Sequence, residues 1–197
     1  MKRSKSRFVI WQYAQVRGAC MLGALEGVED SYELGNGISR VKKFPAEAQF
    51  RMDPDFPDDT VLIDNLFSDE FMIVASPRLT RVVQQAAPSH LEYLPISIIN
   101  HKGKIASRDY HIIHPIDPVD CLDLTMCKPK WGVIKSDSIK SVERLVLDET
   151  RIPADRWIFR PKAFKRVILV RRELAEKIDA ENVTGVRWVE TEDYPEK

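Results

Sequence analysis

The sequence lacks any long hydrophobic run, and no window approaches the roughly 20 apolar residues that a membrane-spanning helix needs. The N-terminus is basic, but Gln12, Gln15 and Arg17 interrupt the apolar stretch that a secretory signal peptide would require. We therefore expect a soluble protein of the cytoplasm, with no membrane partner.

Cysteine is scarce. The three cysteines, Cys20, Cys121 and Cys127, are an odd number and follow no disulfide-framework spacing. Free thiols in a reducing compartment are the simplest interpretation, in agreement with a cytoplasmic location.

An excess of either charge is also absent, because 30 basic residues balance 30 acidic ones. This balance speaks against a general nucleic-acid binder. The most basic part of the chain is diluted by Glu173 and Glu176, so we interpret it as a solvated rim. Its members are Arg160, Lys162, Lys165, Arg166, Arg171 and Arg172. A hydrophobic fraction of 44% and four tryptophans indicate a folded globular chain.

Motifs with a fixed chemistry are missing too. The glycines match neither of the common phosphate-binding loops, and we expect no cofactor. A zinc site made of His111, His114, Cys121 and Cys127 is disfavoured, because residues three apart on a strand point to opposite faces. Acid–base or nucleophilic catalysis remains an alternative for the region from His101 to Asp123. Its candidates are His101, Asp109, His111, Asp120, Cys121 and Asp123.

The stretch from Pro95 to Asp123 predicts a long β-hairpin. Ile96 and Ile98 alternate with a serine, and Lys102-Gly103 supplies a turn. On the return strand, residues 110, 112 and 114 share one face, and residues 111 and 113 share the other. Asp117-Pro118 is typical of a helix start, so we expect a short helix there that contains Cys121.

Other elements follow from apolar periodicity and from capping residues. Helices are predicted after Ser76-Pro77, ending at Pro88, and over residues 171–181, with Asn182 as the cap. Strands are expected at residues 8–13, 71–75, 131–135, 142–147, 157–160, 166–170 and 186–188. This mixed order predicts an α+β fold with a largely antiparallel sheet. We expect a single domain over residues 1–197, possible lobes being 1–88 and 89–197.

Residues 44–59 are rich in proline and in acidic residues. Pro45, Pro54 and Pro57 are expected to exclude a regular helix or a central strand. We expect an ordered surface loop that Phe50 and Phe56 pin to the core.

Carboxylates and phenylalanines alternate from Glu47 to Glu70, where Arg51 is the single cation. Such a segment is suited to a basic protein partner, since complementary charge steers the encounter. A solvated loop with its aromatic side chains turned inward is the alternative interpretation.

Short blocks of sequence spread along the chain resemble a known family, the bacterial polymorphic-toxin immunity family numbered eleven, of the Myxococcus type. The blocks are Ile10-Trp11, Asp53 to Pro57, Ser76, Arg78-Leu79, Asn100 to Gly103, Ala106-Ser107, Asp109-Tyr110, His114-Pro115, Asp120 to Asp123, Leu147 to Glu149, Ile152-Pro153, Phe159-Arg160, Leu169 to Arg172 and Thr184 to Trp188. The resemblance implies a small cytoplasmic protein that protects its own cell in interbacterial competition by binding and inhibiting a co-encoded toxin. It implies no catalytic residue, metal or cofactor.

On this interpretation the partner is a cognate secreted toxin, bound by direct stoichiometric contact. The alternative is an enzyme, hydrolase-like or one that reverses a toxin's modification. The oligomeric state stays open. The residues expected to bind the partner are Asp53, Asp55, Asp58, Asp59, Asp69, Glu70, His101, Lys102 and Arg108.

Overall fold

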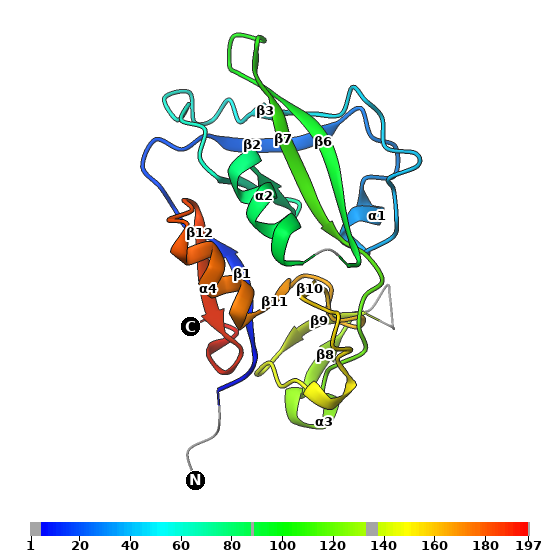
Figure 1. Cartoon of the computed structure of the whole chain (residues 1–197). Helices are drawn as coiled ribbons and strands as arrows, with labels where there is room; N and C mark the ends of the chain where they lie inside the picture. Colours follow the sequence, from blue (N-terminus) through cyan, green and yellow to red (C-terminus); the bar gives the residue numbers. More distant parts are fainter. Residues whose placement is uncertain (1–4, 88, 133–137, 197) are drawn as a thin grey trace.

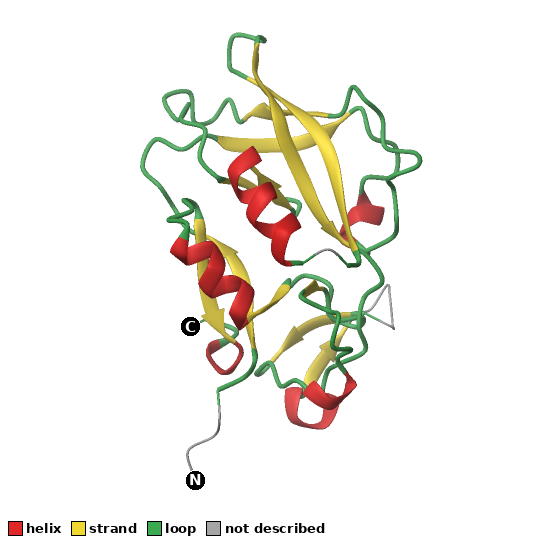
Figure 2. Ribbon diagram, in the orientation of Figure 1, coloured by secondary structure: helices red, strands yellow, loops and turns green. Residues whose placement is uncertain are grey.

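A computed structural model describes residues 5–87, 89–132 and 138–196 of the chain. Strands predominate, and helices cover them from outside (Figures 1 and 2). The α+β class is therefore confirmed, with most strand pairs antiparallel. No helix in these described ranges is long and apolar enough to cross a membrane.

Six strands close into a barrel in the order β2-β3-β6-β7-β5-β4. They are β2 (Met21–Glu26), β3 (Gln49–Met52), β4 (Asn65–Ser68), β5 (Ile73–Ala75), β6 (Leu91–Ile99) and β7 (Ile105–Pro115). Two pairs, β2–β4 and β3–β6, are parallel, and the other pairs are antiparallel. The long hairpin predicted from the sequence is β6 and β7, which project beyond the rest of the molecule at the top of Figure 1.

A four-stranded antiparallel sheet follows the order β10-β11-β1-β12. Its strands are β1 (Phe8–Tyr13), β10 (Ile158–Phe159), β11 (Leu169–Arg171) and β12 (Val186–Glu190). A small ribbon pairs β8 (Pro129–Trp131) with β9 (Ile139–Val142). The chain's first strand therefore joins its last ones, which no local pattern predicts.

The described residues also form four α-helices: α1 (Tyr32–Gly35), α2 (Pro77–Ala86), α3 (Leu124–Cys127) and α4 (Arg172–Ala180). Single 3₁₀ turns occupy Glu149–Arg151 and Thr191–Asp193. In α2 the Ser76 hydroxyl caps the helix by accepting from Leu79 N, as predicted. The helix ends at Ala86, and Pro88, its expected terminator, lies outside the described residues. After α4, Asn182 takes a positive φ one residue beyond the cap residue Glu181.

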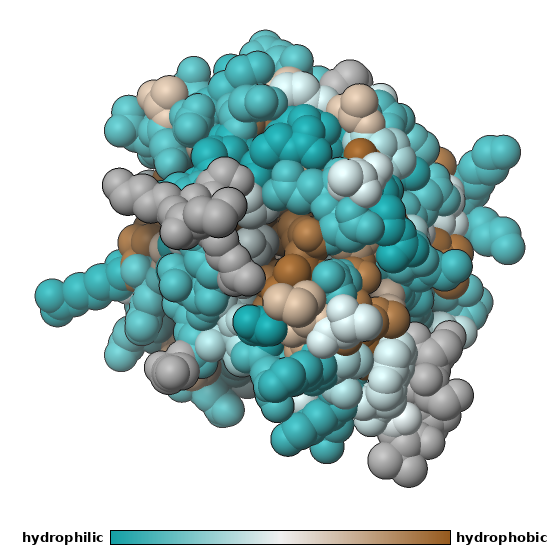
Figure 3. Space-filling model, turned by 90° about the horizontal axis from the view of Figure 1, so that it is seen from below, coloured by the Kyte–Doolittle hydropathy of each residue, from teal (hydrophilic) through white to brown (hydrophobic). Residues whose placement is uncertain are grey.

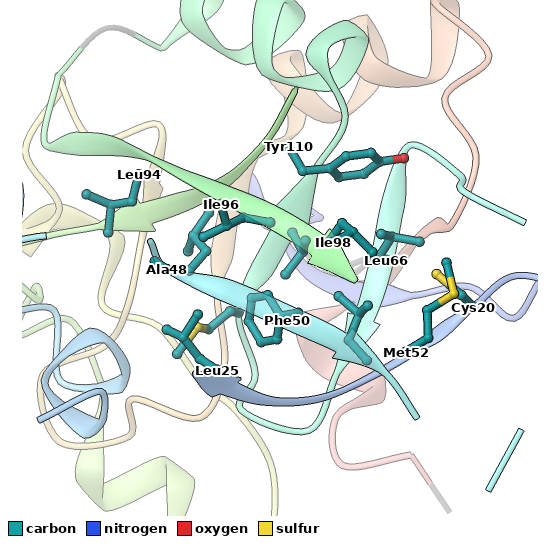
Figure 4. Packing of buried hydrophobic residues seen from close by; sticks show 14 of the residues in the cluster. Cys20, Leu25, Ala48, Phe50, Met52, Leu66, Leu94, Ile96, Ile98 and Tyr110 are labelled. Carbon is teal, nitrogen blue, oxygen red and sulfur yellow. The ribbon is translucent and has the colours of Figure 1, made fainter. Parts of the chain in front are cut away.

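The barrel interior is filled by side chains from every strand, among them Phe50, Ile96 and Tyr110 (Figure 4). Tyr110 also donates its hydroxyl to Ile63 O at 2.7 Å, which satisfies that polar group inside the core. Phe50 therefore pins its segment to the core, as expected from the sequence.

A second core joins the barrel to the four-stranded sheet. It contains Ile73 and Ile113 from the outside of the barrel, Leu79 from α2 and Leu174 from α4. Alternate residues of β1 serve two cores: Val9 faces this one, and Phe8 faces a third core that lies beneath the sheet. Burial on both faces explains why residues 8–11 are continuously apolar.

Strands before and after residue 88 belong to one barrel, because β5 pairs with β7. A lobe boundary at this position would divide the barrel. We therefore propose that the whole chain is a single domain.

Three expectations about individual segments are wrong. Pro45 and Pro54 bracket a strand instead of excluding one, because β3 fits between them and pairs with β2 and β6. Phe56 is exposed and does not pin its loop. Asp117 does not cap a helix: it takes a positive φ, and its carboxylate lies 3.1 Å from His90 Nδ1.

The predicted helix around Cys121 is displaced along the chain. It is α3, and its cap is Asp123, whose carboxylate accepts from Thr125 N and Met126 N. Later strands are also shifted: β9 occupies residues 139–142 instead of 142–147, and most of the strand predicted at 131–135 lies outside the described residues. Seen from below, hydrophobic residues gather near the middle of the surface, with hydrophilic residues around them (Figure 3).

Candidate functional site

Two segments that were singled out separately in the sequence leave the barrel at the same end. Strands β3 and β6 are parallel neighbours, with Arg51 opposite Ile99. The acidic loop follows β3, and the hairpin turn follows β6, so both start side by side. We call this region the barrel end and define it as residues 53–61 and 100–109.

The acidic loop is held by backbone hydrogen bonds. Its first turn is closed from Phe56 N to Asp53 O at 3.1 Å, and its second from Asp59 N to Phe56 O at 3.1 Å. Asp53 N donates to Met21 O, and Val61 N donates to Gly18 O, each at 2.9 Å, so both ends of the loop are fastened to the segment around β2. The carboxylates of Asp55 and Asp58 are exposed on an ordered backbone.

The backbone of the hairpin turn is also held by hydrogen bonds. The side-chain oxygen of Asn100 accepts from Lys102 N and Lys104 N, both at 3.0 Å, and Gly103 takes a φ of +70°. Lys102, Lys104 and Arg108 are exposed. The hairpin is therefore basic, whereas the neighbouring loop is acidic.

Three large hydrophobic side chains are exposed at this end: Phe56 at 44%, Val61 at 52% and Ile105 at 46%. Apolar exposure beside charge of both signs is a feature of protein-binding surfaces. Val61 and Ile105 were missed by sequence analysis. A β-branched residue is expected to be buried in the core unless the register of its strand is known.

Not every predicted contact residue lies at the barrel end. Glu70 belongs to the turn between β4 and β5, and its carboxylate accepts from Leu25 N at 2.9 Å. The backbone N–H of Asp53 donates to Met21 O, at the opposite end of β2. Asp69 and Glu70 are therefore separated from Asp53 along this strand.

The histidines and cysteines considered for metal binding or catalysis have other partners. His114 is buried, and its Nε2 lies 2.9 Å from Ile38 O. His111 lies in β7, and its Nδ1 is buried with no partner among the described residues. Burial raises the pKa of the Cys121 thiol to about 12, and Cys127 exchanges hydrogen bonds with the Val146 backbone. In the described part of the chain, no group of three or more His, Cys, Asp or Glu residues gathers as metal ligands would.

The catalytic candidates are dispersed in the same way. His101 lies in the hairpin turn and Asp109 is exposed on β7. Asp120 pairs with Arg151, and Asp123 caps α3. All three cysteines are free and buried, as the interpretation of free thiols requires.

The basic cluster agrees only in part with the solvated rim expected from the sequence: Lys162 and Arg166 are exposed, but Arg160 is only 2% exposed. Its guanidinium donates to Lys165 O at 2.6 Å and to Phe71 O at 2.8 Å. Arg172 is half-buried and paired with Glu190 at 2.6 Å. Burial of Arg160 follows from its position next to β10, between the second sheet and the barrel.

A family model described as an immunity protein family, Imm11, matches residues 20–193, which include the whole barrel. The class defined by this match is the immunity proteins. The chain belongs to the Imm11 immunity protein family. In the comparison with curated proteins, no sequence matches this chain.

Proposed function

We propose that this protein is a cytoplasmic inhibitor that neutralises a cognate toxin by direct stoichiometric binding, and that the barrel end contacts the toxin. Membership of an immunity family supports the role. The observation that favours the barrel end as the contact surface is that an ordered acidic loop and a basic hairpin lie next to each other there. The proposed contact residues there are Asp53, Asp55, Asp58, Asp59, His101, Lys102 and Arg108.

The physical reasons concern both affinity and rate. A loop already fixed by hydrogen bonds loses little conformational entropy on binding, so more of the contact energy appears as affinity. Exposed Phe56 offers an aromatic anchor of the type that dominates binding energies. The surrounding charges raise the association rate with a partner of complementary charge. Asp69 and Glu70 would contact the toxin only if it covers a surface wider than the barrel end.

The experiment uses the secreted toxin encoded beside this protein. Asp58→Lys combined with Asp59→Lys is expected to weaken toxin binding about tenfold or more at low salt, with a smaller loss at high salt because exposed charges are screened. Binding kinetics at two salt concentrations measure this effect.

The matched control is Glu173→Lys with Glu176→Lys, which reverses two exposed carboxylates on α4. It changes the net charge equally but lies outside the barrel end, so affinity is expected to stay within about twofold. Unchanged affinity of the Asp58/Asp59 variant at low salt would show that the loop is not in the interface. Failure of the natural protein to bind the toxin at all would contradict the proposed function itself.

A further inference from the structure

A cavity of about 550 Å³ lies between the barrel and the second half of the chain, away from the barrel end. Its wall is formed by α1 and the following Asn36, by the β4–β5 turn, by Ser138 and Ile139 at the start of β9, and by the segment 160–166. The exposed aromatic side chains Tyr32 and Phe71 line it. This volume is in the range of pockets that bind small organic molecules.

The lining is strongly positive. Arg160, Lys162, Lys165 and Arg166 line the cavity, and Glu70 is the one carboxylate among its described lining residues. That carboxylate already accepts a hydrogen bond from Leu25 N. None of the four cations makes an ion pair with another described residue. The positive charge is therefore uncompensated by the part of the protein that the structure describes.

The burial of Arg160 makes this excess of positive charge energetically unfavourable. The residue is 2% exposed, its two hydrogen bonds go to neutral backbone carbonyls, and its Nε–H has no acceptor among the described residues. Burial lowers the pKa of the guanidinium to about 10, so the group is still charged at neutral pH. A buried charge without a counter-charge is unfavourable, and a nearby anion would relieve it.

The backbone beside the cavity is shaped to hold these cations. Phe71 takes a φ of +53°, which is unusual for a residue with a bulky side chain. In this conformation its carbonyl accepts from Arg160, while its ring lies 5.3 Å from the guanidinium of Arg166. One residue therefore orients two cations at the cavity.

We propose that the cavity binds a small molecule carrying a phosphate group. The positive excess calls for an anion with more than one negative charge, and a phosphate carries nearly two at neutral pH. Guanidinium and ammonium groups bind phosphate oxygens by charge-assisted hydrogen bonds. Lys162, Lys165 and Arg166 would contact the phosphate, and Arg160 would act on it through its field.

Titration calorimetry at low salt tests the proposal with pyrophosphate, ADP, adenosine and citrate as probes. Pyrophosphate and ADP are expected to bind and to raise the melting temperature, and adenosine is not. Lys162→Ala with Arg166→Ala should weaken both phosphate probes about tenfold or more, because each lost charged hydrogen bond is worth a factor of that order. Arg160 is left intact because it fastens the backbone.

Arg81→Ala with Lys130→Ala is the control, since it removes two exposed cations that have no ion pair with a described residue. Its affinity for pyrophosphate should stay within about twofold of the natural protein. The proposal is overturned by any of three results: no binding of pyrophosphate or ADP at millimolar concentration, adenosine or citrate binding as tightly, or equal weakening by both double variants.

Discussion

At the scale of single residues, His114 shows how burial converts a titratable group into a packing element. The residue is 1% exposed, and its Nε2 is hydrogen-bonded to Ile38 O. Burial lowers the pKa of this imidazole, and the Arg160 charge lowers it further, while the Ile38 hydrogen bond and the Glu92 carboxylate oppose the shift. His114 is therefore neutral at physiological pH and serves the fold.

This shift makes stability depend on pH in one direction. The unfolded chain, with an ordinary histidine pKa of about 6.5, binds the proton more tightly than the folded chain. The free energy of unfolding is expected to fall as pH decreases below about 6.5, by at most about 1.4 kcal/mol per pH unit for this one group.

Urea unfolding between about pH 7.5 and pH 5 measures that slope, and His114→Gln is the comparison, because glutamine retains a donor for Ile38 O without titrating. A flatter profile in the variant is the predicted result. Parallel profiles for both proteins would show that His114 carries none of the pH dependence.

At the scale of elements, a short loop before β12 fastens the second sheet to the barrel. Asn65 N donates to Thr184 O at 3.0 Å, and the Asn65 side chain donates to Gly185 O at 2.7 Å. The Asp64 carboxylate accepts from Thr184 N and from its hydroxyl, each at 3.0 Å. Gly185 permits this approach because its φ is +82°.

Gly185→Ala is predicted to destabilise the protein by about 2 kcal/mol or more. A Cβ there would overlap the carbonyl oxygen of Asn65 and lie 2.7 Å from Ile63 Cδ1. Gly35→Ala is the control, because a Cβ at that position in α1 meets nothing within 4 Å. Denaturant midpoints compare the two variants, and an equally small effect at both positions would mean that the loop can move away from the barrel.

The elements also show what the sequence could predict. The β6–β7 hairpin and helices α2 and α4 were predictable because alternation, helical spacing and capping residues are local signals. Strand β3 was not, since proline argued against a central strand and only the pairing with β2 and β6 reveals how four residues fit between Pro45 and Pro54. Asp117 was misread because a helix-start pattern looks the same when its carboxylate binds His90.

The candidate site was predictable only in part. Its charges and Phe56 are visible in the sequence. The acidic loop and the basic hairpin lie side by side only because β3 pairs in parallel with β6, and these strands are more than 40 residues apart. The burial of Arg160 has the same origin, because its carbonyl partner Phe71 comes from a distant turn. Long-range pairing of this kind leaves no local pattern to recognise.

At the scale of the whole molecule, the barrel and the four-stranded sheet share a core that α2 and α4 help to build. The acidic loop and the basic hairpin extend from the barrel part of this construction (Figure 1). In the function that we propose, each copy of the protein blocks one toxin molecule through this surface and forms no covalent bond with it.

The most direct test is to titrate the neighbouring toxin with this protein and to follow the toxin's activity, at concentrations well above the dissociation constant. Residual activity should fall in a straight line to zero at a fixed molar ratio, and the end point should not move with incubation time. Complete inactivation by a small fraction of an equivalent, progressing with time, would mean that each copy disarms many toxin molecules, which contradicts inhibition by binding.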